Sequence, residues 1–121
     1  MGSAYFEAGE AAVVDVSVPR LEANVALLLR CPALDVRLRG YVSACGADRQ
    51  SGRGALRLSL DRADSVRAFY LRRGIREHQI VTVEGLGRDP GSWGEPGSCG
   101  PAHVRAQRVD TLPHWLLERS N

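Results

Sequence analysis

Residues 56 to 90, LRLSLDRADSVRAFYLRRGIREHQIVTVEGLGRDP, decide the fold of this chain. Apolar residues recur every three or four positions in the first half of the stretch, at Leu56, Leu60, Ala63, Val66 and Tyr70. That period places them on one face of an amphipathic helix. Gly74 stands where a glycine in the left-handed conformation commonly ends a helix. The stretch therefore predicts a long helix with a defined end.

A strand and an irregular segment follow this helix. Residues 80 to 84, IVTVE, alternate between two sets of side chains, which is the period of a half-buried strand. Residues 85 to 101 contain six glycines and three prolines, so we expect no regular structure there.

The other segments predict three more strands, one more helix and a long loop. Residues 4 to 6 suggest a short strand that runs into a polar turn, and residues 36 to 42 alternate as a second strand does. Between them, a helix is expected from Ser17, a suitable N-cap, to Cys31, because Pro32 disfavours helical geometry in the residue before it. Residues 43 to 55, SACGADRQSGRGA, predict a flexible loop, and residues 104 to 112 predict the last strand.

This order of elements predicts an α+β fold, a two-layer sandwich with the helices on one face of a small mixed sheet. Residues 5–112 are expected to form the domain. Residues 1–4 are taken as a cloning remnant and N-terminal tail, and residues 113–121 as a C-terminal tail or short helix.

Composition excludes several classes of protein. The chain has 121 residues, 44% of them apolar and 25% charged, as is usual for one globular domain. No apolar run approaches the length of a membrane span, and no signal peptide is visible, so export is left open. All 16 basic residues are arginine, but acidic residues are interleaved with them and the net charge is +2. We therefore expect no nucleic-acid partner.

The three cysteines, Cys31, Cys45 and Cys99, show no Cys-x-x-Cys spacing. A disulfide is the expected use of two of them in an exported domain, and all three pairings are open. Cys45 with Cys99 is favoured because both fall in predicted loops. Zinc binding by the three cysteines and His103 is the less favoured alternative, since nothing local fixes that geometry. No metal or cofactor is therefore expected.

A family resemblance rests on the run Leu58-Ser59-Leu60-Asp61-Arg62-Ala63. Further matching positions are Val66, Tyr70-Leu71, Gly74-Ile75, Gly85-Leu86-Gly87 and Pro90. Together they resemble the OmpA-like domain, which binds peptidoglycan, and the resemblance covers about residues 5 to 112. It implies a βαβαββ fold. It also implies a non-catalytic module in the periplasm or at the outer membrane, which anchors a protein or membrane to the cell wall.

The resemblance also implies a binding site. In the family, one helical arginine, here Arg62, receives a carboxylate of the diaminopimelate in the stem peptide, and an aspartate at the end of the second strand receives its ammonium. A guanidinium can hold a carboxylate through two parallel hydrogen bonds. The sequence has Ser43 at the aspartate position and Gly54-Ala55 in place of a Tyr-Asn pair, so weakened binding or a different ligand is expected. The expected ligand-binding residues are Arg62, Ser43, Gly46, Tyr41 and Glu7, the last as an acidic residue that compensates in part.

Two other interpretations of these residues are open. Arg62 is alternatively a surface arginine paired with Asp61 or Asp64, and the fold is alternatively kept as a protein-interaction domain with a degenerate pocket. An enzyme is disfavoured, because the three histidines are scattered and no nucleophile elbow or phosphate loop is present.

Overall fold

The structure is a computed structural model that describes residues 1–89 and 101–115. In chain order its elements are β1 (Ala4–Tyr5), η1 (Asp15–Ser17), α1 (Val18–Arg30), β2 (Val36–Val42), η2 (Gly46–Asp48), α2 (Gly52–Arg72), η3 (Glu77–Gln79), β3 (Ile80–Arg88), α3 (Pro101–Ala106) and β4 (Arg108–Pro113). The strands form one sheet in the order β1-β4-β2-β3. Strands β2 and β3 run parallel, whereas β4 is antiparallel to both β1 and β2.

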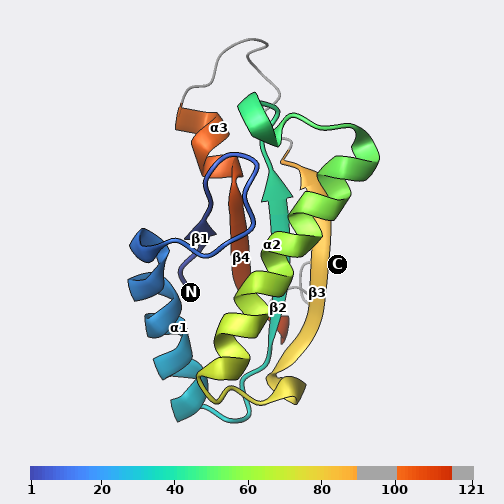
Figure 1. The fold of residues 1–121 in the computed structure, drawn as a ribbon. Helices are drawn as coiled ribbons and strands as arrows, with labels where there is room; N and C mark the ends of the chain where they lie inside the picture. The colour runs from blue at the N-terminus through green and yellow to red at the C-terminus, as the bar shows by residue number, and fades with distance from the viewer. Residues whose placement is uncertain (90–100, 116–121) are drawn as a thin grey trace.

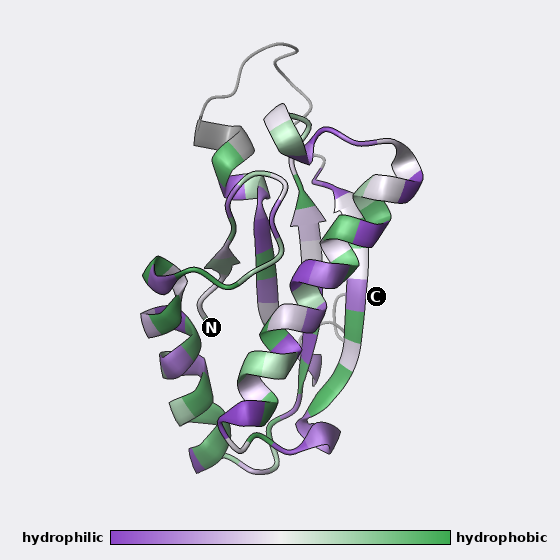
Figure 2. Cartoon of the chain, viewed as in Figure 1, coloured by the Kyte–Doolittle hydropathy of each residue, from purple (hydrophilic) through white to green (hydrophobic). Residues whose placement is uncertain are grey.

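Helices α1 and α2 lie side by side on one face of this sheet (Figure 1). The core between the layers contains Ala63, Val66 and Tyr70 of the predicted apolar face of α2, but Leu56, which was predicted on the same face, is 52% exposed. The core also includes Leu21, Val25, Leu28, Leu38, Phe69 and Val109. Hydrophobic and hydrophilic residues alternate around α2, as an amphipathic helix requires (Figure 2). The predicted α+β two-layer fold with a mixed sheet is confirmed.

Two glycines let α2 approach the sheet closely. A side-chain carbon added at Gly40 in β2 would lie 2.0 Å from the carbonyl oxygen of Ser59, and one added at Gly85 in β3 would lie 2.5 Å from the amide of Leu60. The hydroxyl of Ser59 also accepts a hydrogen bond of 2.9 Å from the amide of Gly87. Leu58 is buried and Ser59 is fully buried. These residues of the Leu-Ser-x-x-Arg-Ala run therefore dock the helix on the sheet.

The structure corrects the predicted boundaries around α2. The helix begins at Gly52, so the last residues of the loop predicted over 43–55 are helical. Ser51 caps this end, because its hydroxyl accepts a hydrogen bond from the amide of Gly54. At the other end Gly74 has a φ of 90°, which confirms the left-handed glycine beyond the helix. Strand β3 reaches Arg88, beyond the predicted end of the strand at residue 84.

The last predicted strand, 104–112, is also wrong in its first part. Residues up to Ala106 belong to α3, which begins at Pro101, and β4 starts only at Arg108. Proline favours the first turn of a helix, because its fixed φ is helical and its missing N–H needs no partner there. The predicted terminal helix has helical backbone at His114 and Trp115, and its remaining residues lie outside the described part.

The first residues are held in the fold, although a tail was expected there. The amide of Gly2 donates to the side chain of Asn24, which donates in turn to the carbonyl of Gly2. The hydroxyl of Ser3 donates to Asp110, and Ala4 is fully buried in β1. In the described part of the chain, no helix combines the length and apolar content that a membrane span requires.

Candidate functional site

Arg62 and Asp48 form a buried ion pair beneath the loop that follows β1. Asp48 belongs to η2 and Arg62 to the middle of α2. The guanidinium meets the carboxylate through two parallel contacts, Nη1 to Oδ2 at 2.7 Å and Nη2 to Oδ1 at 2.6 Å. Neither side chain has any exposed surface. This bidentate geometry is the strongest that an arginine and a carboxylate can adopt.

The other N–H groups of Arg62 hold backbone carbonyls from two segments. Nε donates to the carbonyl of Glu10 at 2.8 Å and Nη2 donates to that of Glu7 at 3.0 Å, both in the loop after β1. Nη1 also donates to the carbonyl of Tyr41 at 3.0 Å, at the end of β2. All five donors of the guanidinium are therefore occupied within the chain.

Both oxygens of the Asp48 carboxylate also accept hydrogen bonds from the backbone. Its Oδ1 accepts a hydrogen bond of 2.6 Å from the amide of Gly9, and its Oδ2 accepts one of 2.9 Å from the amide of Ser43. Gly9 has a φ of 75°, which glycine adopts readily and other residues do not. The ion pair thus ties the loop after β1, the end of β2 and helix α2 to one another.

Both interpretations of Arg62 from the sequence are corrected by this geometry. The guanidinium does not stand free at the mouth of a cleft, and it is not a surface group paired with Asp61 or Asp64. The carboxylate that seemed lost at Ser43 is supplied by Asp48, five residues later. Asp48 is the sole acidic residue of the stretch 43–55. Its position as the one carboxylate in this loop could have indicated it as the partner of Arg62. Its contact with Arg62 was missed because the register of the loop was unknown.

The side chains of Ser43 and Tyr41 line none of the cavities formed by the described residues that are discussed below. Ser43 is fully buried, and its hydroxyl accepts a hydrogen bond of 3.2 Å from the side-chain amide of Gln107. Tyr41 alternates with the buried residues of β2 and therefore faces away from the helices. The guanidinium of Arg108 lies 4.4 Å from its ring centroid. Partial burial raises the pKa of the Tyr41 phenol.

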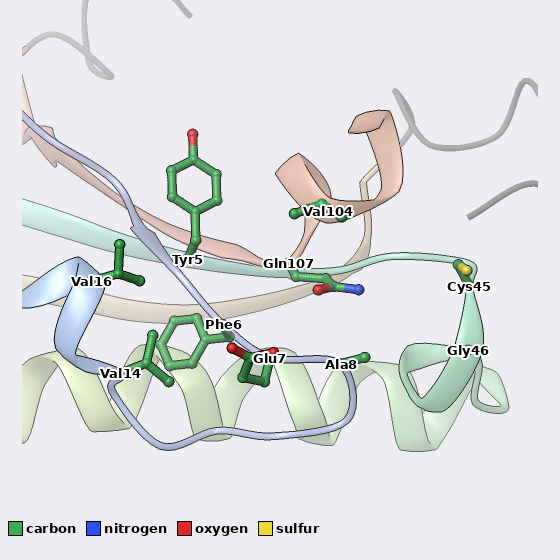
Figure 3. Close-up of a pocket in the computed structure, with 10 residues that line it drawn as sticks. All are labelled: Tyr5, Phe6, Glu7, Ala8, Val14, Val16, Cys45, Gly46, Val104 and Gln107. Carbon is green, nitrogen blue, oxygen red and sulfur yellow. The ribbon is translucent and has the colours of Figure 1, made fainter. Parts of the chain in front are cut away.

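A cavity of about 450 Å³ adjoins this network on the side of β1 (Figure 3). Its walls come from β1 and the following loop, from η1, from the turn after β2 and from the region of α3. The lining residues are Tyr5, Phe6, Glu7, Ala8, Val14, Val16, Cys45, Gly46, Val104 and Gln107. Glu7 is the one charged residue among them. Most of the lining is apolar, which suits a ligand that carries methylene groups and one cationic group.

The structure therefore brings two of the five predicted site residues, Glu7 and Gly46, to one cavity. Arg62 and Ser43 are buried and do not line this cavity. Tyr41 does not line it either, and its carbonyl accepts a hydrogen bond from Arg62. The sequence did not indicate the lining by Val104 and Gln107, because the pairing of β4 with β1 was not predicted from it.

The cysteines are placed in part. Cys31 is exposed and is a free thiol, whereas Cys45 is buried and lines the cavity. Cys99 lies outside the described residues, so its pairing with Cys45 stays a prediction. Over residues 1–89 and 101–115, no three side chains of the metal-binding types come together.

The sequence of this chain matches that of a known family. The model of the OmpA family matches residues 5–97. No curated protein sequence matches the chain. One similar solved structure is the peptidoglycan-associated lipoprotein from Burkholderia pseudomallei, with a TM-score of 0.80 and 20% identity over 94% of this chain and 91% of that one.

Two further structures share the fold. The OmpA-like domain of FopA1 from Francisella tularensis has a TM-score of 0.72 and 20% identity over 92% of this chain and 71% of that one. The C-terminal domain of MotB from Helicobacter pylori has a TM-score of 0.75 and 15% identity over 99% of this chain and 98% of that one. Likeness at these identities establishes the fold alone. The family match spans most of the sequence, and the chain belongs to the OmpA family.

Proposed function

We propose that this chain is a non-catalytic module of the cell envelope that binds the stem peptide of peptidoglycan and thereby anchors a protein or membrane to the cell wall. Membership of the OmpA family supports this function. One of the similar structures supports it through its printed name, since it is a peptidoglycan-associated lipoprotein. The module would work in the periplasm or at the envelope.

The observation that carries the proposal is that one buried ion pair holds two of the segments that form the walls of the cavity. Arg62 donates to the carbonyl of Glu7 in the first wall, and Asp48 accepts from the amide of Ser43, which leads into the turn with Gly46. A cavity whose walls are fixed before the ligand arrives loses little conformational freedom on binding. Arg62 acts in this proposal as a positioning residue and not as a contact of the ligand.

The chemistry of the cavity fits the diaminopimelate end of a stem peptide. This residue offers an ammonium and a carboxylate on one carbon at the end of a methylene chain. The Glu7 carboxylate suits the ammonium, since a charge-assisted hydrogen bond is about twice as strong as a neutral one. The apolar walls, including Phe6 and Val14, suit the methylene chain.

A matched pair of substitutions tests this assignment. Glu7 and Glu10 are both exposed, and both give their backbone carbonyls to Arg62, but only the side chain of Glu7 lines the cavity. We expect Glu7→Gln to weaken binding of a diaminopimelate muropeptide about three- to tenfold, as loss of one partly exposed charged contact should. Glu10→Gln should leave it unchanged. The measurement is an NMR titration that follows the amide signals of residues 5–8 and 45–46.

The outcome of that titration decides the function directly. If no amide signal of the unaltered chain moves at millimolar muropeptide, stem-peptide binding is wrong. If the two glutamine variants bind equally well, the cavity is not the site.

A second candidate is a protein-interaction domain that keeps the fold without the pocket. The observation that favours it is the complete internal use of Arg62, which leaves no guanidinium at that position to receive a ligand carboxylate. Sedimentation with purified cell wall separates the two candidates. Retention of the chain supports the anchor, and its absence across the pH range of the envelope supports the interaction domain.

A further inference from the structure

A second cavity continues the first one along the surface of β1. Its volume is about 370 Å³, and its lining residues are Tyr5, Val16, Ser17, Arg20, Val104 and Arg105. Three of these, Tyr5, Val16 and Val104, also line the first cavity. Tyr5 stands between the two valines in Figure 3. The two cavities therefore adjoin each other at that ring, and together we call them the Tyr5 groove.

The Tyr5 groove has opposite charges at its two ends. Glu7 is the one charged lining residue of the first cavity, whereas Arg20 and Arg105 are the charged lining residues of the second. Apolar side chains separate these ends, and the two valines are largely exposed, Val16 at 77% and Val104 at 55%. An elongated ligand with an ammonium at one end and a carboxylate farther along matches this order of charge.

Arg20 and Arg105 are available for such a ligand. Both side chains are exposed, and neither forms an ion pair with any residue in the described ranges. Six other arginines do form ion pairs: Arg37, Arg57, Arg62, Arg67, Arg73 and Arg108. The guanidinium of Arg20 lies 5.3 Å from the ring centroid of Tyr5, a cation–π contact that holds it beside the groove.

We propose that Arg20 and Arg105 form an anion subsite that receives a carboxylate of the stem peptide whose ammonium lies at Glu7. This inference rests on the proposed function and assigns to these two residues a second carboxylate, which lies farther along the stem peptide than the one on the carbon that carries the ammonium. Guanidinium groups suit this role because their planar fork matches a carboxylate. Since both side chains are exposed, their contribution falls as the salt concentration rises.

The test compares variants of the whole chain by titration calorimetry at low salt. The variants are Arg20→Gln, Arg105→Gln and the double substitution, and the control is Arg30→Gln. Arg30 is an exposed arginine of the same helix as Arg20, and it lines neither cavity. The probes are a diaminopimelate muropeptide with free carboxylates and the same muropeptide with its carboxylates converted to amides.

We expect the double substitution to weaken binding of the free muropeptide about tenfold, each single one to weaken it less, and Arg30→Gln to leave it unchanged. The amidated muropeptide should bind all four variants and the unaltered chain with the same affinity. Lysine at both positions should restore only part of the binding, because it keeps the charge but lacks the planar fork of a guanidinium.

The results separate this subsite from the function on which it rests. If the unaltered chain binds the free muropeptide and the double variant binds it equally well, the subsite is wrong and the proposed function stands. The subsite is also wrong if the loss is the same for the amidated muropeptide. If the unaltered chain binds neither muropeptide, both proposals fall together.

Discussion

The role of Arg62 shows how one residue can keep a family position while its side chain is used internally. Its guanidinium is enclosed by Asp48 and by three backbone carbonyls, and its carbon atom Cζ lies 5.4 Å from the centroid of the Phe6 ring. Removing one member of a buried ion pair lowers the stability of a protein far more than removing one member of an exposed pair. The charge that remains is then held out of water without a partner. The pair therefore stabilises the architecture around the cavity.

A prediction at this scale compares a buried arginine with an exposed one. We expect Arg62→Ala to lower the free energy of unfolding by about 3–5 kcal/mol, because it strands the Asp48 carboxylate. Arg57→Ala should change it by less than about 1 kcal/mol, since Arg57 is 74% exposed and pairs with Asp61 on the helix surface. Urea unfolding of both variants gives the two values. Equal effects would show that Arg62 is not a structural residue.

The identity of the arginine could be predicted from the sequence, but its partner could not. The Leu-Ser-x-x-Arg-Ala run placed Arg62 on the helix correctly, and an acidic role near β1 was assigned to Glu7. The contact with Asp48 depends on how the chain turns between β2 and α2, where η2 and an early helix start shorten the loop. Backbone contacts such as that of Arg62 with the carbonyl of Glu10 leave no trace in side-chain patterns.

At the scale of elements, the packing of α2 on the sheet depends on the absence of side chains at two strand positions. The atom nearest to an added side chain at Gly40 is a backbone oxygen, which cannot rotate away. The helix axis would have to shift, and the core between the layers would open with it.

This packing predicts opposite results for two glycine-to-alanine substitutions. Gly40→Ala should lower the free energy of unfolding by at least about 1–3 kcal/mol, the usual cost of overpacking. Gly52→Ala should leave it unchanged or raise it, because no atom lies within 4 Å of the added carbon and alanine favours the helix. Thermal unfolding of the two variants checks the contrast. A stable Gly40→Ala protein would mean that α2 does not lie this close to β2.

Helices and strands were predicted correctly where the periodic pattern extends over many residues. The prediction failed where the pattern covers only a few. Helix α2 spans many turns, and β2 alternates over its full length, so both were recognised. Helix α3 has six residues, too few to show a helical period, and its end runs directly into β4. Ser51 and the glycines at 52 and 54 looked like loop residues, although Ser51 is a helix cap.

At the scale of the whole molecule, the cavity joins segments from both ends of the chain. Residues of β1 and its loop form one wall, and Val104 and Gln107 form part of another. Cys45 lies on the turn between them. A bond from this residue to Cys99 would close a long loop and restrict the unfolded chain, which commonly stabilises a protein by about 2–4 kcal/mol.

Thiol counting under denaturing conditions checks that pairing. We expect the oxidised chain to react with one equivalent of a thiol reagent, at Cys31, which is exposed and free, and the reduced chain to react with three. Cys31→Ser should then leave no reactive thiol before reduction, whereas Cys99→Ser should leave two. Three reactive thiols in the oxidised chain would exclude the disulfide.

Because Cys45 lines the cavity, we further expect Cys99→Ser to weaken muropeptide binding, since the turn that carries Cys45 and Gly46 would lose its tether to the segment beyond β3.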